Sequence, residues 1–361
     1  MHSASLRPIF DAEGPYVTVH MEVGRDSEDA PQQMDARWTT VRHFLEDEQV
    51  EPKLVTSIGE RLQENTHAPG EVRRTIVGAG TEIVFDDVQI GHSIHPEVTE
   101  IEVLPDLSGW LALEDGAIPF VLVVADREGA DIDVHRALSR AAVDSESVQG
   151  ETFHITKVPQ GDWAQKQFQQ NAENAWHRNA GQVAEAVRSL QRRYRPRLVM
   201  VAGDVRARAD IADQIAAPDV TVVQIESGGR AAGASQEALW SEVEHVLAAT
   251  AAADDKELSD RLDQARGQGS GAAHGLEAVL EALVQSRVEQ LVLDLHAASE
   301  KTVRPRDHEG LPLPAATPTN QDLPADRVLV AAATLSGAEI RLLPESLAHG
   351  GGVAALLRWE D

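Results

Sequence analysis

One segment of the chain combines residue types that bind nucleic acid. Between residues 164 and 197 seven residues are basic and only Glu173 and Glu185 are acidic, although the whole chain has a net charge of −27. Arginine and lysine pair with phosphates, and ring or amide side chains contact exposed bases. The basic residues are Lys166, Arg178, Arg188, Arg192, Arg193, Arg195 and Arg197, and the rings in or beside the segment are Trp163, Trp176 and His177. The segment therefore predicts an RNA-binding helix, with a solvated helix packed by its tryptophans as the alternative.

Two glycine-rich segments suggest nucleotide binding but lack its motifs. GGRAAG at 228–233 follows an expected strand, yet its spacing is not G-x-G-x-x-G and no acidic residue follows at the expected distance. GQGSG at 267–271 lacks the Gly-Lys-Ser/Thr ending of a phosphate-binding loop and follows an expected helix. We expect the first to be a mobile turn and the second a linker, and we predict no cofactor.

Metal ligands and catalytic groups are not indicated either. His92 and His95 are close in sequence, but nothing nearby completes a ligand set, so we expect a structural role. Asp294 and His296 alternate on an expected strand and are interpreted as surface residues. No serine lies in a nucleophile elbow, and the absence of cysteine excludes thiolate catalysis, disulfides and cysteine-based zinc sites. We predict no catalytic residue and no metal site.

The composition is that of a globular protein with several cores. A chain of 361 residues is long enough for two or three domains, and its 42% of apolar residues can fill their cores. No stretch approaches the apolar length of a membrane span, and no basic segment followed by an apolar run begins the sequence, so we expect a cytoplasmic protein. The acidic charge disfavours general adhesion to nucleic acid or anionic lipid, and any RNA contact must be local.

The hydrophobic patterns predict α/β and α+β folding in three domains. We expect an α+β domain over 1–114, a layered α/β domain over 115–252 and an α/β domain over 253–361. In the last domain, residues 301–324 form a Pro-rich segment without periodicity, which we expect to be an exposed insertion.

The middle domain is the most regular in pattern. Residues 119–136 predict a hairpin, and a helical pattern runs from Asp162 to about Tyr194, where Pro196 ends it. The segments RLVMVAGD and DVTVVQIE predict strands on either side of a short helix, and residues 234–265 predict a long helix that leads into the last domain.

The segment QGDWAQKQFQQNAENAWHRNAGQVAEAVRSL, followed by RLVMVAGDVRARADI, resembles the central domain of eukaryotic and archaeal class-1 release factors and of Pelota. In those release factors a Gly-Gly-Gln tip precedes a long helix, a Val-Ala-Glu stretch and a strand ending in Ala-Gly. AHGLEAVLEALVQSRVEQLVLD and LAHGGGVAALLRW are similar to the helix, strand and closing strand of the third domain. The resemblance covers the last two-thirds of the chain and implies a three-domain release-factor/Pelota-like fold of the bacterial, Balon-like branch, actinobacterial type.

The resemblance also shows a departure at the catalytic tip. The Gly-Gly-Gln motif falls on Gly161-Asp162-Trp163, so the glutamine that positions water for ester hydrolysis in release factors is absent. The stop-codon-reading motifs have no counterpart in the first domain. We therefore expect contact with rRNA instead of catalysis from a tip and a helix, made of Gln160, Gly161, Asp162, Trp163, Gln165 and Lys166 and of Arg178, Arg188, Arg192 and Arg193.

The resemblance implies a non-catalytic factor that occupies the vacant ribosomal A site in ribosome hibernation, dormancy or the stress response. Its expected partners are the rRNA of the A site and peptidyl-transferase region, and elongation factor Tu or another translational GTPase. One alternative is a peptidyl-tRNA hydrolase that rescues stalled ribosomes with Gln160 or Gln165. Another is a protein–protein adaptor that has lost ribosome binding, which the high acidity favours.

Overall fold

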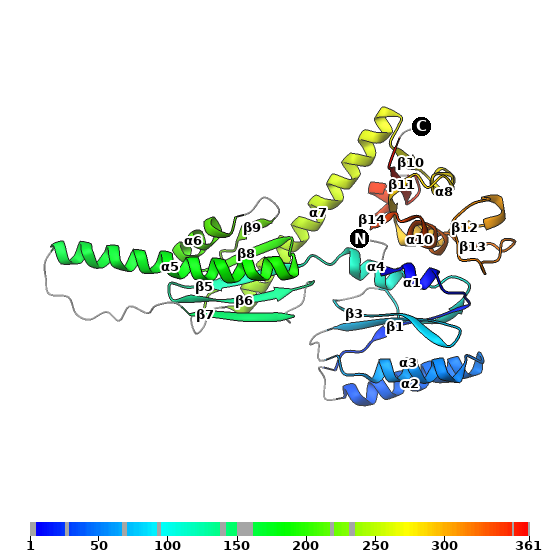
Figure 1. Ribbon diagram of the computed structural model, residues 1–361, viewed down its shortest axis with the longest axis horizontal. Coiled ribbons are helices and arrows are strands. Elements are labelled where there is room, and N and C mark those ends of the chain that lie inside the picture. The colour runs from blue at the N-terminus through cyan, green and yellow to red at the C-terminus, as the bar shows by residue number, and fades with distance from the viewer. Residues whose placement is uncertain are drawn as a thin grey trace. The chain divides into compact units, whose positions relative to one another are not determined.

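The chain forms two compact units, each with its own sheets. In the computed structural model shown in Figure 1, the outer unit comprises residues 1–116 and 252–361, and the central unit comprises residues 117–251. The structure describes residues 5–25, 29–66, 71–91, 95–137, 142–149, 162–216, 220–230, 235–348 and 350–359; along 162–176 the description covers the backbone.

The first part of the outer unit is a four-stranded antiparallel sheet in the order β3-β2-β1-β4. β2 and β3 form a hairpin that turns at Gly80, whose φ of +57° favours glycine. Val19 from the first strand, Leu45 and Ile58 from two helices and Ile76 from the second strand are buried in one core. The elements are α1 (Arg7–Phe10), β1 (Tyr16–Glu22), α2 (Ala30–Asp47), α3 (Pro52–Gln63), β2 (Val72–Ala79), β3 (Glu82–Ile90), β4 (Val98–Glu102) and α4 (Ser108–Asp115).

The second part of the outer unit has a sheet in the order β10-β15-β11-β14. Its apolar helix α10 is buried in a core that also contains Trp110 and Leu111 of α4, so both parts of the unit share apolar residues. Arg341 and Asp115 add an ion pair of 2.9 Å between them. The elements are β10 (Ala272–His274), α8 (Leu276–Val284), β11 (Val288–Leu293), α9 (Leu295–Ser299), α10 (Ala325–Ser336), β14 (Glu339–Leu342), α11 (Glu345–Ala348) and β15 (Val353–Leu357).

One expectation about this part is wrong. Asp294 and His296 do not alternate on a strand, because β11 ends at Leu293 and Asp294 caps α9 by accepting a hydrogen bond of 2.9 Å from Ala297 N. The Pro-rich 301–324 segment is exposed over much of its length, and Val303, Pro305, Pro314, Thr317 and Leu323 are its buried residues. β12 (Thr302–Val303) pairs there with β13 (Leu323–Pro324), and the short helix η2 (Pro305–Asp307) follows β12.

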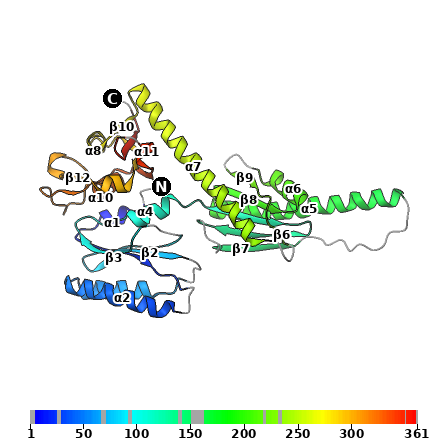
Figure 2. The ribbon, with the colours of Figure 1, turned by 180° about the vertical axis from the view of Figure 1, so that it is seen from behind.

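The central unit is the layered α/β structure that the sequence predicts. Its five strands lie in the order β7-β6-β5-β8-β9, and β8 and β9 run parallel to β5. Helices α5 and α6 cover one face of the sheet and α7 covers the other, as the views from the front and from behind show (Figures 1 and 2). The elements are β5 (Phe120–Ala125), β6 (Gly129–His135), β7 (Asp144–Gln149), α5 (Asp162–Tyr194), β8 (Leu198–Gly203), α6 (Val205–Ile215), β9 (Thr221–Gln224) and α7 (Gln236–Gln268).

Gly203 ends β8 at a point where a side chain cannot fit. Its φ is +110°, and a Cβ atom there would lie 1.9 Å from the carbonyl oxygen of Ala125. The next residue, Asp204, donates its backbone N–H to that same oxygen at 3.0 Å. Glycine therefore allows the chain to stay close to β5 while it turns into α6.

His20 is a buried titratable residue on β1. Its ring is 2% exposed, Nδ1 lies 2.8 Å from Oγ1 of Thr75, and Nε2 packs against Gly109. The charged and titratable groups that face it are Arg73, His95, Glu97 and Asp106. Burial, reinforced by Arg73, lowers the pKa of His20 from 6.5 to about 4.

We expect the outer unit to lose stability in mild acid through His20. Because the pKa is lower in the folded chain, the unfolded chain binds more protons, and stability falls as the pH drops from about 6.5 towards about 4. Between pH 7 and pH 5 this residue alone should cost roughly 2 kcal/mol of unfolding free energy. A His20→Asn variant keeps a polar group beside Thr75 and should lose this part of the pH dependence in denaturant unfolding. Equal pH dependence of the two proteins would contradict the assignment.

Candidate nucleic-acid interface

The helix α5 is anchored by its second half. The 33-residue helix is about 50 Å long at 1.5 Å per residue, and its predicted bounds are confirmed. Ala180, Val183, Ala184, Val187 and Leu190 form a buried stripe at helical spacing and pack in the core under the sheet. The first half extends beyond the ends of the strands (Figure 1). The helix therefore combines a fixed base with a projecting end.

The opposite face of the anchored half is polar and exposed. Because it lies away from the buried stripe, it is the face that can meet a partner. Its exposed residues are His177, Arg178, Gln182, Glu185, Ser189, Arg192 and Arg193. Three of the seven are arginines, which can pair with phosphates, and one is the acidic Glu185.

Arg188 is tied into the fold. Its guanidinium donates to the carbonyl oxygen of Gln214 at the end of α6, at 2.7 Å, and to Glu185 at 3.0 Å. The side chain is 40% exposed. Arg188 therefore joins α5 to α6, and much of its donor capacity is used inside the protein.

Arg192 and Glu185 form a looser pair. The two side chains are separated by 3.3 Å and are 66% and 64% exposed. Hydrogen bonds from Arg188 and Arg192 lower the pKa of Glu185, which keeps that carboxylate charged. Glu185 thus neutralises part of the positive face, and Arg192 can exchange it for a phosphate at low cost because exposed pairs are weak.

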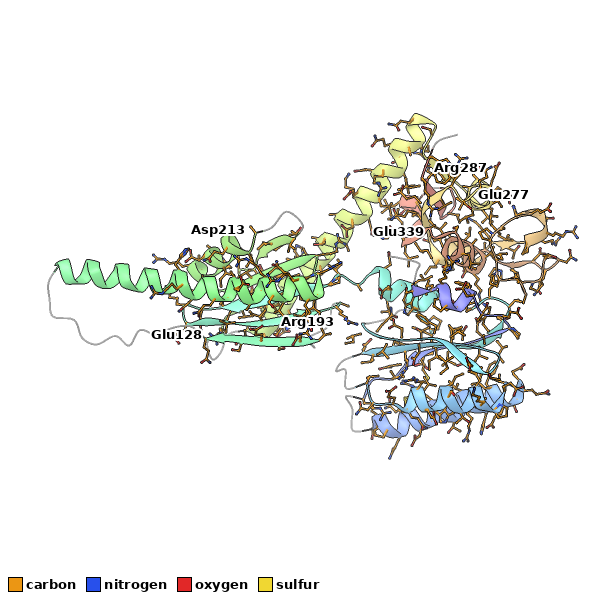
Figure 3. The ribbon with its side chains drawn as sticks, in the orientation of Figure 1. Glu128, Arg193, Asp213, Glu277, Arg287 and Glu339 are labelled. Atoms are coloured by element: carbon orange, nitrogen blue, oxygen red, sulfur yellow. The ribbon has the colours of Figure 1, made fainter. Side chains whose placement is uncertain are left out.

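Arg193 lies at the end of α5, next to β7 (Figure 3). It pairs with Asp144 of β7 at 3.1 Å and its guanidinium sits 4.9 Å from the centre of the Tyr194 ring. The Tyr194 hydroxyl also donates to Asp144, at 2.8 Å, and this bond raises the pKa of Tyr194. With 69% of its side chain exposed, Arg193 is oriented yet open to solvent.

The predicted tip is placed only in part. Gln160 and Gly161 lie outside the described residues. Asp162, Trp163, Gln165 and Lys166 lie in the first turns of α5, where the backbone alone is described. Their expected contact with rRNA stays a prediction, as does that of Arg178, which is exposed on the second half.

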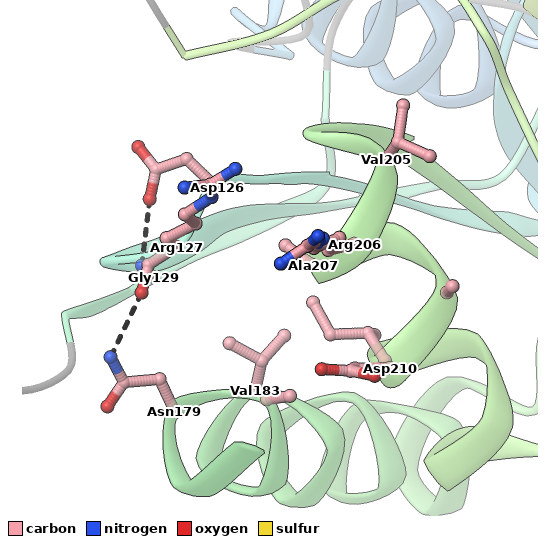
Figure 4. A pocket seen from close by; sticks show the side chains of 12 residues that line it. Asp126, Arg127, Gly129, Asn179, Val183, Val205, Arg206, Ala207 and Asp210 are labelled. Atoms are coloured by element: carbon pink, nitrogen blue, oxygen red, sulfur yellow. Dashed lines mark hydrogen bonds between the residues drawn. The ribbon is translucent and has the colours of Figure 1, made fainter. Parts of the chain in front are cut away.

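A pocket beside α5 has no counterpart among the sites that the sequence predicts. A cavity of about 390 Å³ lies between the β5–β6 turn, the start of α6 and the middle of α5. Figure 4 shows Val183, Arg206 and Asp210 around it, and Asn179, whose Nδ2 donates to the carbonyl oxygen of Arg127 at 3.1 Å. The pocket could not be recognised locally, because its walls come from three separate segments.

The other segments considered as sites in the sequence show no ligand-binding arrangement in the part of the chain that the structure describes. In GGRAAG, Gly228 has a φ of +92° and Arg230 binds Asp126 and Asp131 at 3.0 Å each, so this segment is held to the β5–β6 hairpin. Residues 231–233 lie outside the described part, as does His92. Within the described part of the chain, no group of three or more His, Asp or Glu side chains is arranged to hold a metal.

Charge is divided unevenly between the two units. Residues 117–251 contain 14 basic and 18 acidic residues, a net charge of −4. The outer unit contains 18 basic and 41 acidic residues, a net charge of −23. The acidity of the chain therefore belongs mainly to the outer unit, and the unit that carries α5 is nearly balanced.

Residues 119–268 match the family described as bacterial archaeo-eukaryotic release factor family 2. The Mycobacterium tuberculosis protein Rv2629 is 27% identical over 372 residues, which cover 99% of this chain and 97% of the relative. Among solved structures, Dom34 of S. cerevisiae has a TM-score of 0.43 at 9% identity and covers 99% of this chain and 92% of its own. Ribosome-bound archaeal Pelota also has a TM-score of 0.43, at 15% identity, and covers 80% of this chain and 78% of its own.

None of the described helices is long and apolar enough to cross a membrane.

The two arginines that share Glu185 should differ in their effect on stability. Arg188→Ala removes the charged donor of the Gln214 carbonyl and should lower the unfolding free energy by about 1 kcal/mol. Arg192→Ala, the matched control, should change it by less than about 0.5 kcal/mol because its pair is exposed. Thermal unfolding of the two variants measures the difference. Equal losses would show that Arg188 is no more structural than Arg192.

Proposed function

Because residues 119–268 match the bacterial archaeo-eukaryotic release factor family 2, we propose that the chain is a release-factor-like, non-catalytic ribosome-binding factor. In this proposal the protein occupies the vacant A site, and α5 carries the tip towards the peptidyl-transferase region. The family match of the central unit is the observation that carries the proposal. A cytoplasmic location follows from it.

The form of α5 supports this role. A tip that enters an RNA-lined site must project from its domain while its base stays rigid, and α5 extends beyond the strands while five apolar residues hold its second half. Exposed arginines on the anchored half, above all Arg192 and Arg193, can then contact phosphates along the entry path. Trp163 at the tip would stack on an exposed base, worth about 1–3 kcal/mol.

The charge division supports the central unit as the part that binds RNA. A surface with a net charge of −23 repels phosphates, whereas one with −4 and a locally basic helix can bind them. The outer unit is better suited to protein partners. We propose that its second part contacts elongation factor Tu or another translational GTPase, and that the complex protects idle ribosomes in hibernation or stress.

Replacing tip residues distinguishes this role from catalysis. The sequence at the Gly-Gly-Gln position is Gly161-Asp162-Trp163, so no glutamine stands where release factors place the one that orients water. Under the proposal, the Gln160→Ala/Gln165→Ala double variant binds ribosomes only slightly more weakly, because the other tip residues and the arginines of α5 remain, and the wild-type protein releases no peptide from peptidyl-tRNA. Release that the double variant abolishes would instead establish a rescue hydrolase.

Ribosome binding should depend on salt through the exposed arginines. Ribosome binding is measured by co-sedimentation with empty bacterial ribosomes at several salt concentrations. Arg192→Ala/Arg193→Ala removes two phosphate contacts, so the plot of log affinity against log salt should become less steep, by roughly 1 to 2 in slope. Arg261→Ala/Arg306→Ala is the matched control, because these arginines are exposed to a similar degree on the acidic outer unit. Adding elongation factor Tu should increase the bound fraction of the wild-type protein.

Two results would count against the proposal. Absence of binding to empty ribosomes even at low salt would leave a protein–protein adaptor on a related fold, because electrostatic attachment is strongest there. If Arg192→Ala/Arg193→Ala and the control Arg261→Ala/Arg306→Ala weaken ribosome binding equally, α5 is not the RNA-binding element.

A further inference from the structure

The pocket beside α5 lies at the carboxyl ends of β5 and β8, two adjacent strands from which the chain continues towards opposite edges of the sheet. From β5 the chain turns to β6 on one side, whereas from β8 it continues through α6 to β9 on the other side. In open α/β sheets ligands bind outside the carboxyl ends of parallel strands, and β5 and β8 are parallel neighbours that end here. The 390 Å³ cavity lies at this point, and it falls within the range of about 300–1,000 Å³ that is typical of small-molecule sites.

The floor of the pocket is apolar. Ala180 and Val183 contribute from α5, and Ala207 and Ile211 contribute from α6. Val205 lies at the rim and is 69% exposed, which is unusual for a residue of its type beside a cavity. A flat aromatic group inserted here would cover these side chains and remove apolar surface from water.

Two charged side chains of the lining are unpaired. Arg206 and Asp210 lie one turn apart on α6, and neither side chain makes a hydrogen bond or ion pair with any residue that the structure describes. The other two charged residues of the lining are paired: Arg127 pairs with Asp204 at 3.4 Å, and Asp126 pairs with Arg230 at 3.0 Å. One guanidinium and one carboxylate are thus available to a ligand.

An anionic group in this pocket must be held by a side chain. The N–H groups of Arg206 and Ala207, which would otherwise face a ligand from the start of α6, already donate to the Asp204 carboxylate at 3.1 and 3.3 Å. The guanidinium of Arg206 is exposed and can form a two-point hydrogen bond to a phosphate. Asp210 accepts hydrogen bonds only, so it fits hydroxyl or amino groups.

We propose that this pocket binds one nucleotide. The base lies on the apolar floor, the ribose hydroxyls donate to Asp210 and the phosphate pairs with Arg206. The same chemistry can be supplied by a free mononucleotide or by a nucleotide turned out from rRNA. Binding of a free mononucleotide does not depend on the proposed ribosomal function, whereas binding of an rRNA nucleotide rests on it.

Calorimetric titration of the full chain with AMP, GMP, CMP and UMP tests the first source. We expect one mononucleotide to bind with 1:1 stoichiometry, and Arg206→Ala and Asp210→Asn each to weaken it about tenfold or more. Asp213→Asn is the matched control, because Asp213 is an exposed carboxylate of the same helix outside the pocket (Figure 3). It should leave the affinity unchanged, and circular dichroism of each variant verifies folding.

Co-sedimentation with empty ribosomes tests the second source. If the nucleotide belongs to rRNA, free mononucleotides give no heat, while Arg206→Ala and Asp210→Asn reduce ribosome binding and Asp213→Asn does not. The proposal is overturned if no mononucleotide binds and both pocket variants bind ribosomes like the wild type. It is also overturned if a mononucleotide binds equally well to the wild type and to both pocket variants, or if the protein binds neither mononucleotides nor ribosomes.

Discussion

The contact between the second half of α5 and the sheet of the central unit determines where the functional groups of that helix lie. Ala180, Val183, Ala184 and Val187 are buried almost completely there, which fixes the rotation of the helix about its axis. That rotation places Arg192 and Arg193 towards solvent and leaves the first half of the helix free to project. The same contact forms one wall of the pocket at the carboxyl ends of β5 and β8.

A second constraint is electrostatic. A chain with a net charge of −27 can bind RNA only if its acidic residues are kept away from the phosphates, and most of them belong to the outer unit. Within the central unit, Arg188 and Arg192 of α5 pair with Glu185, and Arg193 pairs with Asp144. These pairs orient the guanidiniums and neutralise part of their positive charge. The reduced charge disfavours general adhesion to nucleic acid, and the fixed orientation favours one arrangement of phosphates over others.

Much of the fold could be predicted, because it follows local patterns. The bounds of α5 at Asp162 and Tyr194 follow from apolar periodicity and Pro196, and the alternation of strands and helices after it is equally regular. The partners of the basic residues could not be predicted. The Gln214 carbonyl lies 26 residues from Arg188, Asp144 lies 49 residues from Arg193, and neither is connected to its partner by any local motif. The pocket escaped prediction for the same reason, and Asp294 was misplaced because a capping aspartate continues the polarity pattern of a strand.

The central claim, that α5 carries the contact with rRNA in the A site, is tested most directly by cleavage of rRNA from a defined position on the helix. Because the chain has no cysteine, His177→Cys provides a single attachment point for an iron chelate on the exposed face, and Gln285→Cys provides one on the outer unit. If α5 carries this contact, hydroxyl radicals from position 177 cut large-subunit rRNA around the A site of the peptidyl-transferase region, and tRNA bound in the A site abolishes these cuts. Cuts at the same nucleotides from both positions, or cuts that A-site tRNA leaves unchanged, would contradict it.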